Sequence, residues 1–226
     1  MMKLIQFTNK LLFGLILLSI IACGENHALK EETIYFDDNN ADWLIEDTVD
    51  YSFIMIDNYG ISKSFSMINN SYYFGKSWTT ILGINTEMTF SEYHYQSFTS
   101  SYGQNFTISL SAGFEPFGDE IYIVVGETAF AYDIKFKTVS RLDLNGEYLS
   151  KTMYEDGYGD ETEINSIVEI LNNYTVNDIV YAKVLHFTLK DFSSKWHDNT
   201  VTEIYVAQKY GLIKYALNGG TEYYRN

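Results

Sequence analysis

Cysteine and proline are almost absent from this sequence, with Cys23 and Pro116 the single examples in 226 residues. One thiol cannot form a disulfide within the chain or supply a cysteine-rich zinc site. A chain of this length can bury a core large enough to fold without such crosslinks. The lone proline lies within residues 113–120, where it interrupts the pattern of the neighbouring segments.

Basic residues are also scarce, with 15 lysines and arginines against 30 aspartates and glutamates. Residues 1–22 contain two of the lysines and no acid, so the remaining chain carries a net charge of −17. Such a surface repels the phosphates of nucleic acid, and we expect no nucleic-acid partner. It also repels anionic lipid headgroups, so electrostatic attraction cannot hold the protein at a membrane.

Motifs of known catalytic and cofactor sites are missing. The sequence contains no Gly-x-Ser-x-Gly motif and no P-loop. Thr162 stands where a dinucleotide fingerprint begun by Gly157 would need its third glycine. The histidines lack the spacing of a helical or hairpin metal site: His27, His94, His186 and His197. We therefore expect no catalytic residue, no bound metal and no cofactor.

The first 26 residues carry the most specific signal in the chain. Lys3 and Lys10 precede an apolar run, residues 11–22, that ends in a small residue. This layout is typical of a secretory signal peptide. The run is too short for a transmembrane helix, because spanning the hydrocarbon core requires about 20 apolar residues. Residues 1–22 are therefore predicted to be a signal peptide.

The end of this run, Ile20-Ile21-Ala22-Cys23, resembles the lipobox of bacterial lipoproteins. The resemblance implies that Cys23 receives a diacylglycerol, that residues 1–22 are removed, and that the new amino terminus is acylated too. Two or more acyl chains attach a protein stably to a membrane, whereas one chain binds marginally. The alternative is an ordinary signal peptide that happens to contain a cysteine.

The residues after Cys23 bear on location. In lipoproteins of Gram-negative cells, an aspartate directly after the cysteine resembles an inner-membrane retention signal. Gly24 stands there instead, so the resemblance implies residence in the outer membrane. Residues 23–32 are polar and lack apolar periodicity, which predicts a short flexible tether.

The remaining residues favour strands. The sequence has 20 tyrosines and 15 phenylalanines, and aromatic residues suit a pleated, half-buried surface. Several segments alternate between apolar and polar residues, and no helix-length crossover separates them. We predict an all-β fold, or a β-rich fold with one short helix. Its antiparallel curved sheet would be a half-barrel or sandwich, in a single domain over residues 33–226.

Turn signals divide the predicted strands. We expect turns at residues 57–60, 69–70, 145–146, 177–178 and 218–220. The last of these turns would join one long segment, residues 202–215, to residues 221–224. Residues 163–171 are ambiguous, because Ile164, Ile167, Val168 and Leu171 have helical spacing while alternate positions also suit a strand. The strand is favoured because the neighbouring segments are strands.

Two C-terminal passages, residues 175–186 and 203–215, resemble the closing strands of small, mostly uncharacterised bacterial envelope lipoproteins. The pattern is also similar to the curved half-barrels of lipoprotein carriers such as LolA and of LppX. The resemblance implies a fold and an envelope location. It carries no catalytic residue.

Aromatic side chains provide the candidate ligand site. We select Trp43, Trp78, Tyr93, Tyr95 and Trp196, because such rings form platforms for sugars or line apolar grooves. Other tyrosines cluster nearby in the sequence, namely Tyr72, Tyr73 and Tyr102. The alternative is that these rings pack in the core or along a sheet face, as most aromatics in β-rich domains do.

Together these signals predict a protein held in the outer membrane by the lipid on Cys23. We expect a non-enzymatic binding module for an apolar or carbohydrate ligand or an envelope partner. One alternative is a carbohydrate hydrolase with paired carboxylates, for which Glu87 and Glu92 are candidates. The other is a structural or assembly lipoprotein.

Overall fold

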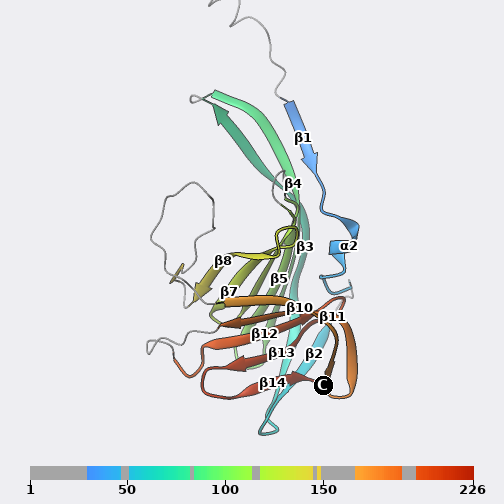
Figure 1. The fold of residues 1–226 in the computed structure, drawn as a ribbon, viewed down its shortest axis with the longest axis vertical. Helices are drawn as coiled ribbons and strands as arrows, with labels where there is room; N and C mark the ends of the chain where they lie inside the picture. The colour runs from blue at the N-terminus through green and yellow to red at the C-terminus, as the bar shows by residue number, and fades with distance from the viewer. Residues whose placement is uncertain are drawn as a thin grey trace, which may run out of the picture. The chain divides into compact units, whose positions relative to one another are not determined.

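The computed structural model describes residues 30–46, 51–81, 84–113, 118–144, 147–148, 166–189 and 197–226 (Figure 1). The signal peptide and Cys23 therefore lie outside the described residues. The described chain contains fourteen strands and one four-residue helix, which confirms the prediction of a β-rich fold with one short helix. Within it, no helix is long and apolar enough to cross a membrane.

The first half of the chain contains nine strands and the helix. Their bounds are β1 (Lys30–Ile34), α2 (Asp38–Ala41), β2 (Ser52–Asp57), β3 (Ser62–Ile81), β4 (Ile84–Ser100), β5 (Asn105–Ser111), β6 (Glu120–Val125), β7 (Thr128–Asp133), β8 (Thr138–Leu144) and β9 (Glu147–Tyr148). The second half contains five: β10 (Ser166–Val176), β11 (Ile179–Leu189), β12 (Val201–Ala207), β13 (Gly211–Leu217) and β14 (Glu222–Arg225).

All of these strands belong to one sheet in the order β10-β11-β12-β13-β14-β2-β3-β4-β5-β6-β7-β8-β9, with β1 beside β4. The pairings from β10 to β3 and from β4 to β9 are antiparallel, as predicted. Along the path from β10 to β9, neighbours in the sheet are consecutive in the sequence except where β14 pairs with β2; β1, which lies off this path, pairs with β4. The pairing of β14 with β2 joins the two halves of the chain.

The structure divides into two compact units. The larger unit holds residues 33–76 and 90–226. The smaller unit holds residues 1–32 and 77–89, of which the described parts are the start of β1 and the adjoining ends of β3 and β4. Residues 77–89 of the predicted single domain thus belong to the smaller unit.

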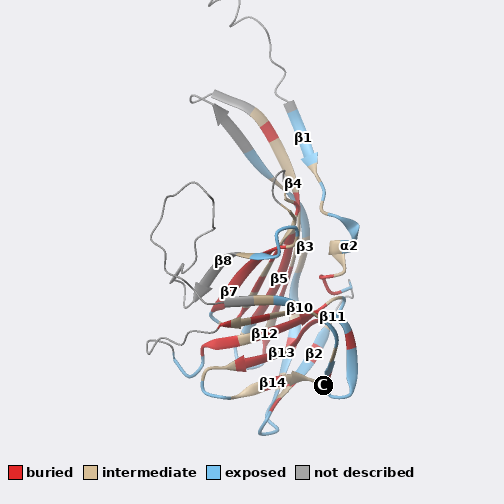
Figure 2. Cartoon of the chain, in the orientation of Figure 1, coloured by how far each residue is buried: buried red, intermediate tan, exposed pale blue. Residues whose placement is uncertain are grey.

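The sheet of the larger unit curves around a filled apolar core. Its two ends approach each other where β10 meets β8, so the curve is barrel-like and nearly closed. Side chains from both halves of the chain meet inside, as the stacked rings of Phe130 and Phe187 show, with centroids 4.4 Å apart. Phe53, Phe65 and Phe106 belong to the same cluster. Figure 2 shows buried residues along β5, β7, β12 and β13.

A segment near the start of the larger unit, residues 42–46, packs into this core. Trp43, Leu44 and Ile45 are buried. The backbone of Ile45 is held by the fully buried amide of Gln96, which accepts from its N–H at 2.8 Å and donates to its carbonyl at 2.7 Å. The backbone N–H of Lys209 donates to the carbonyl of Asp42 at 2.6 Å. These bonds satisfy backbone groups that burial would otherwise leave unpaired.

Most predicted turns that can be compared with the structure are in place. β2 and β3 pair across residues 57–60, β10 and β11 pair across Asn177–Asp178, and β13 and β14 pair across residues 218–220. Residues 145–146 lie outside the described residues, but the strands that flank them pair from Leu144 to Glu147. The ambiguous segment is a strand from Ser166 onward, and residues 163–165 lie outside the described residues.

Two predictions about segments were wrong. Asn69-Asn70 is not a turn, because β3 continues through both residues, and the Asn70 side-chain oxygen lies 2.7 Å from His94 Nε2 on β4. Residues 202–215 are two strands and not one. The chain turns between β12 and β13, where Lys209 and Gly211 have φ angles of 67° and 72°. Pairing with neighbouring strands overrides local turn propensity in the first case.

Gly211 provides a test of how the core is closed. A Cβ added there would lie 2.5 Å from Ile45 Cδ1, and the backbone is left-handed. Gly211→Ala should therefore lower the free energy of unfolding by about 2–5 kcal/mol, from left-handed strain together with overpacking. Gly60→Ala is the matched control, since its φ is 86° and nothing lies within 4 Å. It should lose only about 1–2 kcal/mol in urea unfolding. Equal losses would contradict the contact with Ile45.

Candidate functional site

Of the five aromatic residues selected from the sequence, the structure describes the side chains of Trp43, Tyr93 and Tyr95. Trp43 is 5% exposed and belongs to the core. Tyr93 and Tyr95 lie half-buried on β4. The Trp78 side chain and all of Trp196 lie outside the described residues. The structure does not show these five residues as one cluster, and their ligand-binding role stays a prediction.

Tyr93 has a packing role that accounts for its position. Its ring stacks on Tyr73, with centroids 5.4 Å apart and an interplanar angle of 8°. A Cβ at Gly75 would lie 3.2 Å from the same ring, so Tyr93 covers the bare backbone of that glycine. An aromatic residue over a strand glycine fills the space that a side chain would otherwise occupy. Tyr73 and Tyr93 therefore stabilise the pairing of β3 with β4.

The opposite face of β3 presents apolar side chains to solvent. Ile68, Tyr72 and Phe74 stand on one face because side chains alternate along a strand. They are 62%, 54% and 39% exposed, and Tyr35, which is 64% exposed, packs its ring edge-on to Phe74 at 5.7 Å. We call Tyr35, Ile68, Tyr72 and Phe74 the aromatic face. The sequence clustering of Tyr72 and Tyr73 hinted at it, but Tyr35 and Phe74 were missed.

Glu92 lies buried beside the aromatic face and holds it together. One carboxylate oxygen accepts from the Tyr72 hydroxyl at 2.7 Å, and the other accepts from the Phe36 N–H at 2.8 Å. The hydrogen bond to Glu92 raises the pKa of Tyr72 to about 12, so the phenol stays neutral. Glu92, on β4, thereby connects the segment that carries Tyr35 to β3 and β4. Both of its oxygens are engaged in these bonds.

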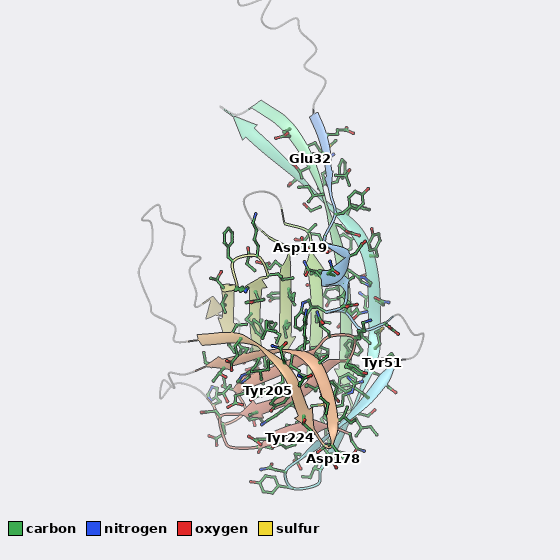
Figure 3. All side chains as sticks on the ribbon, turned by 45° about the vertical axis from the view of Figure 1, so that its right-hand side comes forward. Glu32, Tyr51, Asp119, Asp178, Tyr205 and Tyr224 are labelled. Atoms are coloured by element: carbon green, nitrogen blue, oxygen red, sulfur yellow. The ribbon has the colours of Figure 1, made fainter. Side chains whose placement is uncertain are left out.

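A second group of side chains crosses five neighbouring strands on the C-terminal half of the sheet. The registers place Glu169 opposite His186, His186 opposite Tyr205, Tyr205 opposite Lys214, and Lys214 opposite Tyr224. We call these five residues the polar ladder. Figure 3 labels Tyr205 and Tyr224 among the side chains of these strands.

The members of the polar ladder pack against one another. The His186 ring stacks on Tyr205 with centroids 4.1 Å apart, and Lys214 Nζ lies 5.2 Å from the Tyr205 ring and 5.1 Å from the Tyr224 ring. Burial, followed by a hydrogen bond to Glu203, raises the pKa of Tyr205 above its ordinary value. Burial and the Glu222 hydrogen bond raise the pKa of Tyr224 to about 12. The side chains of the polar ladder therefore find their ring, cation–π and hydrogen-bond partners in one another and in the adjacent Glu203 and Glu222.

One part of the ladder has the geometry of a proton relay. His186 Nδ1 lies 3.0 Å from Glu169 Oε1, and its Nε2 lies 2.8 Å from Thr188 Oγ1. Acyl transfer would also require backbone N–H donors for an oxyanion. Thr188 is paired with Ile167 of β10 on one side and with Glu203 of β12 on the other. The backbone N–H groups around it therefore take part in strand pairing. Within the described residues, the arrangement contributes to the pairing of β10, β11 and β12.

The polar ladder was missed by sequence reasoning. Its members are far apart in the chain, and alternation shows only which positions share a face of their own strand. The two C-terminal passages that resemble envelope lipoproteins contain His186, Tyr205 and Lys214. That resemblance was the one available signal, and it did not indicate that these side chains meet.

The two carboxylates named for a hydrolase, Glu87 and Glu92, belong to different compact units, and their catalytic role stays a prediction. Glu87 belongs to the smaller unit and Glu92 to the larger one. The oxygens of Glu92 accept structural hydrogen bonds, as described above. Among the described residues, no group of three or more histidine, cysteine and acidic side chains is placed to hold a metal ion.

Comparisons with known proteins found no matching family model, curated protein or solved structure.

Glu222 provides a pH test of the ladder. The hydrogen bond from Tyr224 and the nearby Lys214 hold the Glu222 pKa below its ordinary value of 4.5. A lowered folded-state pKa contributes stability above the unfolded pKa, and that contribution is lost as pH falls through the folded pKa. The stability of the wild type relative to Glu222→Gln should therefore stay constant while the pH is well above the ordinary value of 4.5, and should decrease as the pH falls from there through the folded pKa. Urea unfolding at several pH values measures this difference.

Tyr224→Phe is the control for this experiment, since it removes the hydrogen bond and leaves the carboxylate. It should move the Glu222 pKa back toward its ordinary value and weaken the same acid dependence. A difference between the wild type and Glu222→Gln that stays the same from about pH 6 to about pH 3 would contradict the coupling.

Proposed function

We propose that this protein is a lipid-anchored, non-enzymatic binding module of the outer membrane. The lipobox-like sequence at Cys23 supports the anchor, and Gly24 supports the outer-membrane location. Its partner is an apolar or carbohydrate ligand or another component of the envelope. The partner binds on the outside of the curved sheet.

The filled interior of the sheet carries this proposal. A carrier of lipids needs an open cavity or cleft lined by apolar side chains. Here the inward side chains of both halves meet, and Phe65, Phe98, Phe130 and Phe187 are completely buried. Dense packing of this kind among the described residues favours a surface over the interior as the place where a partner binds.

The aromatic face is the surface best suited to that role. Scattered exposed apolar residues are ordinary, but rings gathered on one face of a soluble domain mark a binding surface. Tyr72 contacts both Phe74 and His94 edge-on, with centroids 5.7 and 6.0 Å apart. These contacts hold the rings in fixed positions before a partner arrives, which lowers the entropic cost of binding.

The same filled interior is compatible with a structural or assembly role, which is the second candidate. The hydrolase candidate gains no support from the described residues, because both carboxylate oxygens of Glu92 already accept structural hydrogen bonds. A binding module holds a small ligand, whereas a structural or assembly protein does not. Mass spectrometry of the purified protein distinguishes the two roles.

Replacing the proposed lipid acceptor tests the anchor. Cys23→Ser should release the protein from the membrane fraction or leave it with its first 22 residues uncleaved, because no thiol remains to accept lipid. Fractionation and intact mass measure the two effects. Lys10→Ser is a control in the same segment that keeps the thiol. A Cys23→Ser protein that remains both cleaved and stably anchored would disprove the lipoprotein assignment.

Mass spectrometry of the purified protein tests where binding occurs. Extraction with organic solvent should release no lipid held non-covalently in a one-to-one ratio, because the interior is filled. The covalent adduct on Cys23 serves as the internal reference. A stoichiometric, extractable lipid would contradict surface binding and favour a carrier. A retained glycan that is lost from Tyr35→Ser/Phe74→Ser, but kept by Tyr59→Ser/Tyr102→Ser, would identify the ligand as carbohydrate.

A further inference from the structure

The aromatic face lies where the chain enters the larger unit. Tyr35 belongs to the face, and the next residue, Phe36, is fixed to β4 by the hydrogen bond between its N–H and Glu92. The proposed lipid acceptor, Cys23, precedes Tyr35 by only twelve residues. A chain of that length spans at most about 43 Å. The anchor therefore keeps the aromatic face close to the bilayer.

A short connection changes the affinity that a docking surface needs. Once the lipid is inserted, contact between the domain and the bilayer is an intramolecular event, with an effective concentration in the millimolar range. A surface with weak intrinsic affinity is then occupied for much of the time. The aromatic face does not have to attract the protein to the membrane. The free energy of contact between the aromatic face and the membrane has only to be favourable once the lipid has brought the two together.

The chemistry of the face suits the lipid–water interface. Tyrosine combines an apolar ring with a polar hydroxyl and is enriched at the headgroup level of membrane proteins. Phe74 and Ile68 add apolar area, which increases the strength of interfacial binding. The phenol of Tyr72 is neutral and hydrogen-bonded to Glu92. The buried carboxylate of Glu92 is withdrawn from the surface that would meet the lipids.

Charge restricts which lipids are suitable. The chain after residue 22 carries a net charge of −17, so anionic headgroups would repel the domain as a whole. Asp37, two residues after Tyr35, is engaged locally, where its side chain accepts from the Asn39 N–H at 2.9 Å and begins α2. A face of neutral rings meets zwitterionic headgroups without that electrostatic cost.

We infer that Tyr35, Ile68, Tyr72 and Phe74 dock on the zwitterionic headgroup interface of the bilayer that holds the Cys23 lipid, which fixes the orientation of the domain. The inference rests on the proposed lipid anchor and identifies the partner of the aromatic face as the membrane itself. The polar ladder and the other surfaces of the larger unit are then left for other contacts.

Site-specific photocrosslinking in intact envelopes tests the inference. The photoreactive residue p-benzoylphenylalanine is placed singly at Tyr35, Phe74, Tyr59 or Tyr102, and the adducts are identified by mass spectrometry. Tyr59 and Tyr102 are matched controls, because they are 74% and 69% exposed but lie in turns outside the face. Phospholipid adducts should be roughly ten-fold more abundant at Tyr35 and Phe74 than at the controls, as expected from anchoring beside this face.

A second set of variants links the crosslink to the face. With the probe at Ile68, Tyr35→Ser/Phe74→Ser should abolish most of the lipid adduct, whereas Tyr59→Ser/Tyr102→Ser should leave it unchanged. Protein or glycan adducts at Phe74, equal lipid adducts at all positions, or no adduct would each overturn the inference. Intact mass and membrane fractionation of each variant measure lipidation and membrane attachment independently of the crosslinks. An unlipidated Cys23 would overturn the proposed function, whereas a lipidated protein without face-specific adducts would overturn only the docking.

Discussion

The pairing of β14 with β2 is the constraint on which the larger unit depends. It makes neighbours of the last strand and of β2, near the start of the chain, with Tyr223 opposite Asp57 and Arg225 opposite Met55. Arg225 reinforces the seam, because its guanidinium lies 4.6 Å from the centre of the Phe53 ring. A charged group stacked on a ring within a paired seam gains both packing and electrostatic attraction. Without this pairing the two halves would be separate sheets, each with one apolar face uncovered.

Closure of the sheet decides what the interior can do. Once both halves share one core, their aromatic side chains fill the space that a carrier would keep open. Residues 42–46 complete the core, and Gln96 compensates the cost of burying the backbone of Ile45. The same packing that stabilises the domain is the reason for proposing a surface, and not the interior, as the place of binding.

The two distinctive surface groups illustrate opposite ways of placing aromatic residues. In the polar ladder, Tyr205 is 6% exposed because His186, Lys214 and the neighbouring strands cover it. In the aromatic face, Tyr35 and Tyr72 remain more than half exposed while Glu92 fixes the base of the face. The first arrangement uses its rings to stabilise the sheet. The second holds its rings in place and leaves them available for a partner.

The resemblance at Cys23 concerned location and that of the C-terminal strands concerned fold and location, and the described residues do not test the location. The comparison with half-barrel carriers concerned the fold, and the described residues form a nearly closed curved sheet around an apolar core. Of the candidate ligand residues, Trp43 is explained by core packing and Tyr93 by its contacts with Tyr73 and Gly75. Residue type alone could not separate these roles, because a ring has the same hydrophobicity in a core and on a platform.

The sequence by itself determined the β-rich class, the antiparallel hairpins and turns such as Asn177–Asp178, because alternation and turn chemistry act between residues close in the chain. Tertiary structure alone decided that β3 continues through Asn70, that Tyr35 joins Phe74, and that His186 meets Tyr205. These outcomes depend on register and on the pairing of distant strands. A strand's own residues specify which side chains share a face, but not which neighbour that face will meet.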